Sequence, residues 1–230
     1  MLEIEGVSAR YGEAKVLHDV SLRVGEGEVV TLVGRNGAGK TTLLNCAMGL
    51  HRSMTGRVRF AGRDVTAAPP HRRARLGLGL VPDDRGVYAS LSVEENLTLP
   101  PVKGVSPWPL ERIYNTFPAL AARRRFPGAK LSGGEQQMLA LARVLRAGAR
   151  LLLCDEPTEG LAPVIVQRIG DILREAKEQG VAVLLVEQNL RFATTVADRH
   201  YLLGQGRVVE SLDNTDVRER EGELLAHLGL

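Results

Sequence analysis

The residues best suited to chemistry form a glycine-rich loop at positions 34–42. Its spacing matches the phosphate-binding pattern G-x-x-x-x-G-K-[ST], which ends here in Lys40 and Thr41. Glycines lack side chains, so backbone N–H groups can point at phosphate oxygens, while Lys40 reaches the β- and γ-phosphates and the Thr41 hydroxyl holds Mg²⁺. The alternative is a glycine-rich turn that binds nothing. We predict that phosphate binds to the whole loop: Gly34, Arg35, Asn36, Gly37, Ala38, Gly39, Lys40, Thr41 and Thr42.

A second chemical feature is a pair of carboxylates that follows an apolar run. Residues 151–154 are apolar and lead directly into Asp155 and Glu156, and α/β proteins bind ligands at such carboxyl ends of buried strands. Asp155 can orient Mg²⁺ through its water shell, and Glu156 can polarise the water that attacks a γ-phosphate. Taken alone, the segment could be an acidic turn after a strand. In a chain that also carries a phosphate loop, it predicts a hydrolytic site.

The elements that must position these residues follow from the hydrophobic pattern. Period-two alternation at residues 2–7, 16–24 and 57–60 predicts a half-buried antiparallel sheet at the N-terminus. Residues 151–154 and 181–186 are continuously apolar, as strands covered on both faces must be, and residues 164–176 between them have helical spacing. The fold class predicted is α/β, with a mixed sheet core and an N-terminal antiparallel subdomain.

Residues 84–150 have a different pattern, rich in turns and helical spacing. Ser92 and Glu95 fit a capping box that opens one helix, and Ser132 with Glu135 fits a second one before an apolar stripe at 138–145. We expect a helical subdomain inserted into one domain that spans residues 1–230. Taken alone, the segment around Ser132 could be no more than an ordinary helix start.

Composition narrows the class of protein further. The 30 basic and 27 acidic residues leave a net charge of +3, which gives little reason to expect a nucleic-acid partner. The two cysteines, Cys46 and Cys154, lie far apart in apolar stretches, so buried reduced thiols in a reducing compartment are expected. Histidine spacing supports no metal site, and neither a leader nor a membrane-spanning run is expected.

Three motifs in this order resemble the nucleotide-binding subunits of ATP-binding cassette (ABC) transporters: the phosphate loop, the segment L-S-G-G-x-Q at 131–136 and the strand that ends in D-E-P at 155–157. The resemblance covers nearly the whole chain and implies a P-loop NTPase fold of the ABC type. It also implies that two cassettes sandwich two ATP molecules head to tail. The signature residues would then bind the nucleotide held by the partner cassette: Ser132, Gly133, Gly134 and Gln136.

The same resemblance gives roles to four further side chains. Tyr11 matches the aromatic residue that stacks on adenine, although it could also be an ordinary sheet tyrosine. Lys40 and Glu156 match the catalytic lysine and base. Most cassettes carry a glutamine that contacts Mg²⁺ where this chain has Asp83, and a switch histidine where it has Gln188. We expect Asp83 to join Thr41 and Asp155 at Mg²⁺, and Gln188 to position the γ-phosphate without titrating.

These departures resemble one branch of the family. V-P-D-D-R at 81–85, G-L-A-P at 160–163 and V-E-Q-N at 186–189 are similar to the LivF-type ATPase of branched-chain amino acid importers, whose relatives serve urea and short amides. The partners implied are a LivG-like second cassette or a copy of this chain, permease subunits and, indirectly, a periplasmic or extracellular solute-binding protein. The place implied is the cytoplasmic face of a bacterial inner membrane, with the permease's coupling helix seated against residues 83–97.

Three other functions remain open from the sequence. An exporter or lipid-transport ATPase would carry the same catalytic motifs, although the segments at 160–163 and 186–189 count against it. A non-transport cassette acting on DNA or ribosomes would need a long coiled coil or a second fused cassette. The third is a module that senses ATP without hydrolysing it, and the intact Lys40, Asp155 and Glu156 argue against it.

Overall fold

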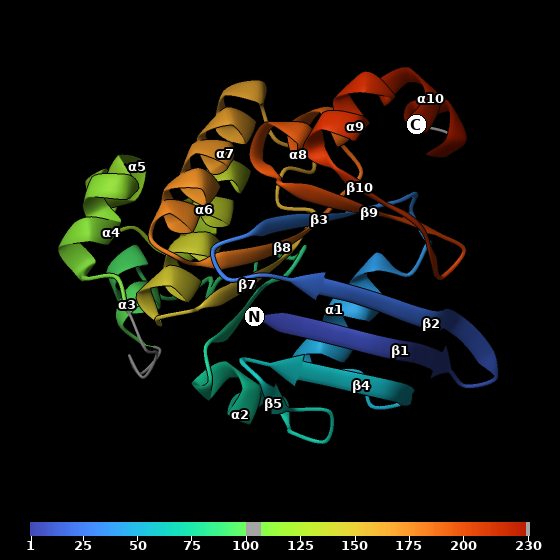
Figure 1. Ribbon diagram of the computed structural model, residues 1–230. Coiled ribbons are helices and arrows are strands. Elements are labelled where there is room, and N and C mark those ends of the chain that lie inside the picture. Colours follow the sequence, from blue (N-terminus) through green and yellow to red (C-terminus); the bar gives the residue numbers. More distant parts are fainter. Residues whose placement is uncertain (100–106, 229–230) are drawn as a thin grey trace.

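The computed structural model describes residues 1–99 and 107–228. Its centre is a six-stranded sheet in the order β10-β9-β3-β8-β7-β6 (Figure 1). Five of these strands run parallel and β10 pairs antiparallel with β9. The strands are β3 (Val29–Val33), β6 (Leu78–Val81), β7 (Leu151–Asp155), β8 (Ala182–Glu187), β9 (Arg199–Gly204) and β10 (Arg207–Asp213).

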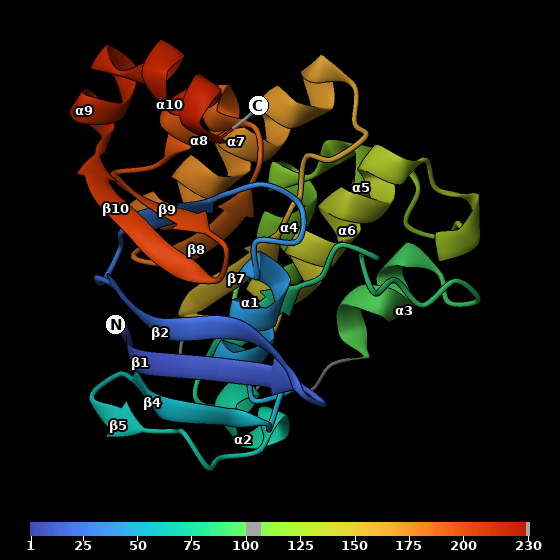
Figure 2. The ribbon, with the colours of Figure 1, turned by 90° about the vertical axis from the view of Figure 1, so that its right-hand side faces the viewer.

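A four-stranded antiparallel sheet in the order β2-β1-β4-β5 lies beside the central sheet (Figure 2). In β1, buried side chains such as Leu2 and Ile4 alternate with more exposed ones, which confirms the period-two prediction for the N-terminus. Its strands are β1 (Leu2–Tyr11), β2 (Ala14–Val24), β4 (Met54–Phe60) and β5 (Arg63–Asp64).

The central strands are buried on both faces because helices cover one side, and α1 (Lys40–Met48) packs between the two sheets on the other (Figures 1 and 2). Successive residues of β7 therefore belong to different cores: Leu152 packs with the helices, while Leu151 and Leu153 pack with α1 and the antiparallel sheet. This two-sided burial explains the continuous apolar runs.

Among the residues that the structure describes, four α-helices come between β6 and β7, where the helical insertion was predicted. The capping boxes of Ser92 with Glu95 and of Ser132 with Glu135 are both formed. The predicted fold class, α/β with an N-terminal antiparallel sheet and an inserted helical part, is confirmed. These helices are α3 (Val93–Thr98), α4 (Leu110–Thr116), α5 (Pro118–Ala122) and α6 (Gly133–Arg146), with a 3₁₀ turn, η1 (Gly128–Lys130), before α6.

The remaining helices complete the molecule. The predicted helix between β7 and β8 is formed and ends one turn before β8, whereas the C-terminal β9–β10 hairpin had no counterpart in the sequence prediction. The remaining helices are α2 (Pro70–Arg75), α7 (Pro163–Glu178), α8 (Leu190–Val196), α9 (Asn214–Glu219) and α10 (Glu221–Leu228).

Among the described residues no helix is both long and apolar enough to span a membrane, and Cys46 and Cys154 are buried free thiols.

Candidate active site

The phosphate loop leaves the end of β3 and leads into α1, so the helix begins at Lys40 and its N-terminus faces the loop. Gly37 and Gly39 have φ angles of 79° and 105°, in the left-handed region that favours glycine. The N-cap of α1 is Gly39, which makes no side-chain capping bond. The first N–H groups of α1 thus have no side-chain acceptor from the cap, as expected where a helix end binds an anion.

Lys40 is buried at the centre of the site. Its side chain is 4% exposed, and its Nζ forms an ion pair with Glu156 Oε1 at 3.1 Å. The same ammonium donates to the backbone oxygens of Gly34 at 2.7 Å and Arg35 at 3.0 Å. One positive charge thus links the phosphate loop to the carboxylate that follows β7.

Glu156 is held in an unusual backbone conformation. Its φ of 44° lies in the left-handed region, which is uncommon for a residue with a side chain. Its N–H donates to the Val186 carbonyl of β8 at 3.0 Å, which fixes the turn against the neighbouring strand. Such strain often accompanies functional positions, because the surrounding structure has to maintain it.

Gln188, which directly follows β8, links the phosphate loop to the loop that carries Glu156. Its Nε2 donates to Asn36 Oδ1 at 2.7 Å and to Glu156 Oε2 at 2.9 Å. The structure therefore brings together residues predicted from three separate motifs. We refer to the side chains of Asn36, Lys40, Glu156 and Gln188 as the Glu156 pocket.

Asp155 lies beside Thr41 with an oxygen that lacks a partner. Burial raises the pKa of this carboxyl to about 6, opposed by a hydrogen bond with the Thr41 side chain and increased by the nearby Asp83 charge. Asp155 Oδ1 is buried and accepts no hydrogen bond within the described part of the chain. A buried free carboxylate oxygen beside a hydroxyl and a second carboxylate is a donor set that suits Mg²⁺.

The residues predicted to stack on adenine and to form the signature make their contacts elsewhere in the chain. Tyr11 ends β1 on the antiparallel sheet, is 52% exposed, and has its ring 4.5 Å from that of His51. Ser132 caps α6, and Gln136 accepts from Arg85 at 3.1 Å and donates to the Gly128 carbonyl at 3.1 Å. The structure thus forms the helix start at Ser132 and leaves the nucleotide roles of Tyr11, Ser132, Gly133, Gly134 and Gln136 as predictions.

Glu187 is a residue of the site that the sequence prediction did not single out. It is only 3% exposed, accepts from the Thr158 hydroxyl at 2.7 Å, and has a pKa raised by burial to about 7. One feature of the sequence could have indicated it: Glu187 is a charged residue at the end of an apolar strand, and burying a carboxyl there is costly.

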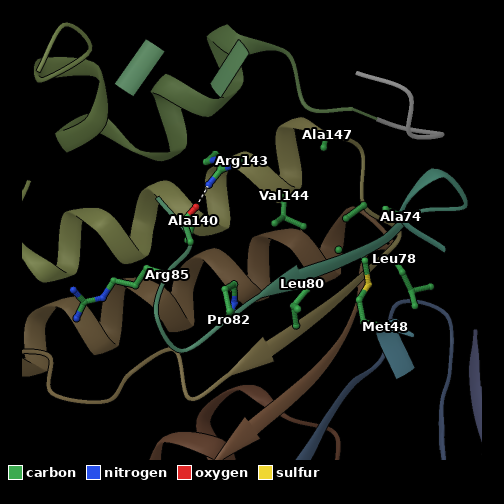
Figure 3. Close-up of a pocket in the computed structure, with 13 residues that line it drawn as sticks. Met48, Ala74, Leu78, Leu80, Pro82, Arg85, Ala140, Arg143, Val144 and Ala147 are labelled. Carbon is green, nitrogen blue, oxygen red and sulfur yellow. Dashed lines mark hydrogen bonds between the residues drawn. The ribbon is translucent and has the colours of Figure 1, made fainter. Parts of the chain in front are cut away.

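A groove lies between β6 and α6, and Pro82, Arg85 and Gly86 of the loop after β6 line part of it (Figure 3). Leu78 and Leu80 of β6 and Ala140 and Val144 of α6 line it, and we call it the β6–α6 groove. Arg143 stands at one end, donates to the Gly86 carbonyl, and places its guanidinium 4.5 Å from the centre of a neighbouring aromatic ring, that of Tyr88.

The turn that borders this groove is fixed by one buried amide. Asn96 of α3 is 0% exposed and accepts from the Tyr88 N–H at 3.0 Å. Its Nδ2 donates to the carbonyls of Tyr88, Leu91 and Ser92 at 3.0–3.1 Å. In all four of these hydrogen bonds the partner of the Asn96 side chain is a main-chain atom, so one side chain holds the main chain of residues 88–92 in place.

Comparison with known proteins identifies the family. Residues 17–159 match the model of the family described as ABC transporter, which is more than half of the chain. The chain belongs to the ABC transporter family. It is accordingly an ABC-type ATPase and an ATP-binding subunit, as the three motifs predicted.

Relatives within the family act in more than one kind of transport. The chain is 42% identical over 212 residues to the high-affinity branched-chain amino acid transport ATP-binding protein BraG of Pseudomonas aeruginosa, covering 91% of each chain. It is 37% identical to a probable branched-chain amino acid transport ATP-binding protein LivF of Archaeoglobus fulgidus (96% and 95% covered). It is also 35% identical to the lipopolysaccharide export system protein LptB of Acidithiobacillus ferridurans (95% of each covered). The predicted resemblance to the LivF branch is confirmed.

Solved structures of this family share the fold over at least 93% of the chain. An ATP-binding subunit of an ABC transporter matches with a TM-score of 0.86 at 28% identity, covering 100% of both chains. A dimeric ATP-binding cassette bound to ADP and Pi matches with a TM-score of 0.82 at 25% identity, covering 93% of this chain and 99% of that one.

Proposed function

We propose that this ATP-binding subunit powers the import of branched-chain amino acids, with urea or short amides as related substrates. The observation that carries the proposal is the Glu156 pocket, in which Gln188 takes the place of a histidine, as expected for the LivF branch. The similarity to BraG and LivF supports the same branch. Similarity to LptB, at 35% identity, supports lipid export as the second candidate.

Hydrolysis is assigned to residues of the pocket. Glu156 acts as the base that activates water. Its carboxylate is held in place by Lys40 at 3.1 Å and by Gln188 at 2.9 Å. Lys40 binds the β- and γ-phosphates, and Gln188 positions the γ-phosphate through its amide N–H. Thr41, Asp155 and Asp83 would hold Mg²⁺, which would neutralise charge on the phosphates.

ATP binding is completed by a second cassette. The signature at the start of α6 meets the γ-phosphate bound by a partner cassette; in its own chain, Gln136 of the signature bonds to Arg85 and Gly128, which lie outside the Glu156 pocket. The dimeric cassette bound to ADP and Pi supports this arrangement. We propose a LivG-like homologue as the partner, with a copy of this chain as the alternative, and Tyr11 as the adenine platform.

Transport follows from docking on permease subunits at the cytoplasmic face of a bacterial inner membrane. The β6–α6 groove and residues 83–97 receive a short permease helix, because most of the residues that line the groove are apolar, with Arg85 and Arg143 among them, and because it adjoins the loop that carries Asp83. A periplasmic or extracellular solute-binding protein selects the solute. Nucleotide state and permease shape are thereby linked through one segment.

The catalytic assignment is tested by phosphate release from ATP with Mg²⁺. We expect Glu156→Gln to lower turnover at least hundredfold and Gln188→Ala about tenfold. Glu178→Gln, an exposed carboxylate at the far end of α7, serves as the control and retains the parent rate. A parent rate in Glu156→Gln would remove Glu156 from the role of base.

The direction of transport is tested on the chain reconstituted with its permease subunits and binding protein in vesicles. Uptake of labelled leucine, urea or a short amide that depends on ATP supports import. ATP turnover that responds to lipopolysaccharide, with no solute uptake, supports the export candidate instead.

A further inference from the structure

We propose that Glu187 is a positioning residue for ATP hydrolysis, whose buried carboxyl anchors the loop that follows Glu156. This inference rests on the proposed role of Glu156 as the base. It goes beyond that role because, within the described residues, the side-chain hydrogen bonds of Glu187 go to Thr158 and Asn189 and not to the phosphate loop or the signature. It acts through the main chain of another loop.

The anchor is a compact set of contacts at the end of β8. The Thr158 hydroxyl donates to Glu187 Oε1 at 2.7 Å, and the Asn189 N–H approaches Oε2 at 3.4 Å. Glu187 and Thr158 are 3% and 6% exposed, so water does not compete freely for this bond. Both carboxyl oxygens of Glu187 therefore face protein donors.

The loop needs such an anchor because of the backbone at Glu156. A left-handed φ of 44° persists at a residue with a side chain only where neighbouring contacts enforce it. Two contacts enforce it from β8: the Glu156 N–H donates to Val186 at 3.0 Å, and Thr158 binds Glu187 two residues further along. The last two residues of β8 thus hold the turn at both of its ends.

Glu187 also lies next to the residue that holds the Glu156 side chain. Gln188 donates to Glu156 Oε2 at 2.9 Å and to Asn36 in the phosphate loop at 2.7 Å. Adjacent residues thus fix the side chain and the main chain of the same catalytic group. If the Thr158 contact is lost, the turn relaxes and the carboxylate moves relative to the phosphate loop, and displacements of this kind can cost much of a rate.

A carboxyl is a costly residue for a purely structural contact at this place. Glu187 is buried near the negative charge of Glu156, and Cys154 is close enough to feel its field. An unpaired buried carboxyl would destabilise the fold, whereas a satisfied one gives a single geometry. The choice of residue favours precise placement of the loop over stability.

The test measures steady-state hydrolysis on the purified full-length chain with ATP and Mg²⁺. We expect Glu187→Ala and Thr158→Val each to lower kcat at least tenfold, with the KM for ATP within twofold of the parent. Glu187→Gln and Thr158→Ser keep an acceptor and a hydroxyl, and we expect both to recover kcat to within threefold. The double variant should be no slower than the slower single one, because both changes break one contact.

A stability control separates positioning from a loss of folded protein. Glu28 accepts from Arg199 at 3.0 Å ahead of β3, so Glu28→Ala removes a comparable carboxyl contact away from the Glu156 pocket. It should lower the melting temperature and leave kcat unchanged. If Glu187→Ala does not fold, the contrast between Thr158→Val and Thr158→Ser decides the matter.

Several results would overturn the inference: a parent kcat in folded Glu187→Ala, a rise in KM alone, no recovery in the conservative variants, or losses that multiply in the double variant. Its failure is distinguishable from failure of the proposed function. A slow Glu156→Gln with a fast Glu187→Ala rejects only the anchor, whereas a fast Glu156→Gln rejects the catalytic assignment itself.

Discussion

The Glu156 pocket and the β6–α6 groove are held together in different ways. In the pocket, Lys40 and Gln188 bond to the side chain of Glu156, at 3.1 Å and 2.9 Å. Beside the groove, the Asn96 amide and the Arg143 guanidinium bond to main-chain carbonyls. In the pocket, side chains are therefore held by other side chains. Beside the groove, two side chains instead hold the main chain in place.

This difference predicts two kinds of failure. A change in the pocket leaves another reactive side chain without its partner, so it should affect the chemical step first. A change beside the groove releases main-chain carbonyls from a buried donor, so it should affect the fold or docking first. Substitutions that reverse this assignment would show that the two regions are not separate.

The largest effect is expected in the pocket from Lys40→Ala. The variant lacks the only ammonium among the described contacts of Gly34, Arg35 and Glu156, and we expect hydrolysis to fall by about a thousandfold. Phosphate release measures the rate, and circular dichroism verifies that the chain is folded. Lys177→Ala, which removes a partly exposed ion pair with Asp198, is the matched control and should keep the parent rate.

Asn96→Ala should produce the largest loss of stability beside the groove. It removes four hydrogen bonds made by a fully buried amide: the Tyr88 N–H loses its side-chain acceptor, and three carbonyls each lose one of their two donors. We expect the free energy of unfolding to fall by about 3 kcal/mol. Urea denaturation measures this loss, with Thr98→Ala on the exposed side of α3 as the control. Hydrolysis is measured at low temperature, where the variant is still folded. If Asn96→Ala then hydrolyses ATP more slowly but is as stable as the parent, the groove and the pocket are not separate.

The pH dependence of stability should distinguish the two regions next. The pKa of Glu187 rises from 4.5 to about 7 on folding, chiefly through burial, with the Glu156 charge adding to the shift. A raised pKa stabilises the fold below pH 4.5, and this contribution is lost as the pH rises through 7. Between pH 5 and 8 we expect unfolding to become easier by about 2 kcal/mol.

Urea denaturation across this range checks the prediction against two variants. In Glu187→Gln, the free energy of unfolding should change much less between pH 5 and 8. A smaller dependence on pH remains, because the pKa of Asp155 is also raised, to about 6. Arg143→Gln beside the groove should keep the parent slope, since a guanidinium stays protonated throughout this pH range. Equal slopes in the parent and in Glu187→Gln would contradict the assignment.

Much of the fold could be predicted because local patterns determined it. The apolar run ending in Asp155, the capping boxes at Ser92 and Ser132 and the glycines before Lys40 each depend on neighbours in the chain, and all of these elements are formed. The C-terminal β9–β10 hairpin was not predicted. Residues 207–211 of β10 alternate only weakly between exposed and half-buried positions, since this strand lies at the sheet edge.

The contacts of the pocket could not be predicted from local patterns. β8 follows β7 in the chain but lies between β3 and β7 in the sheet, and only this strand order places Gln188 against both Asn36 and Glu156. Periodicity does not fix strand order. Glu187 was missed for the same reason, because its partner Thr158 belongs to a loop that follows another strand.

The smallest effect is expected at the surface of the groove, where a charge should uncouple transport from hydrolysis. Tyr88 is 47% exposed beside Arg143, and Leu91 lies three residues further along the same turn. In vesicles with the permease, we expect Tyr88→Glu or Leu91→Glu to reduce uptake about tenfold, because an apolar helix would then face a buried charge. Hydrolysis by the purified chain should stay within twofold of the parent, since neither side chain touches the Glu156 pocket. Val209→Glu, a charge introduced at an exposed apolar residue of β10, is the control and should alter neither activity. If uptake and hydrolysis fall equally, a change at the groove also disturbs the Glu156 pocket, and the two regions are not functionally separate.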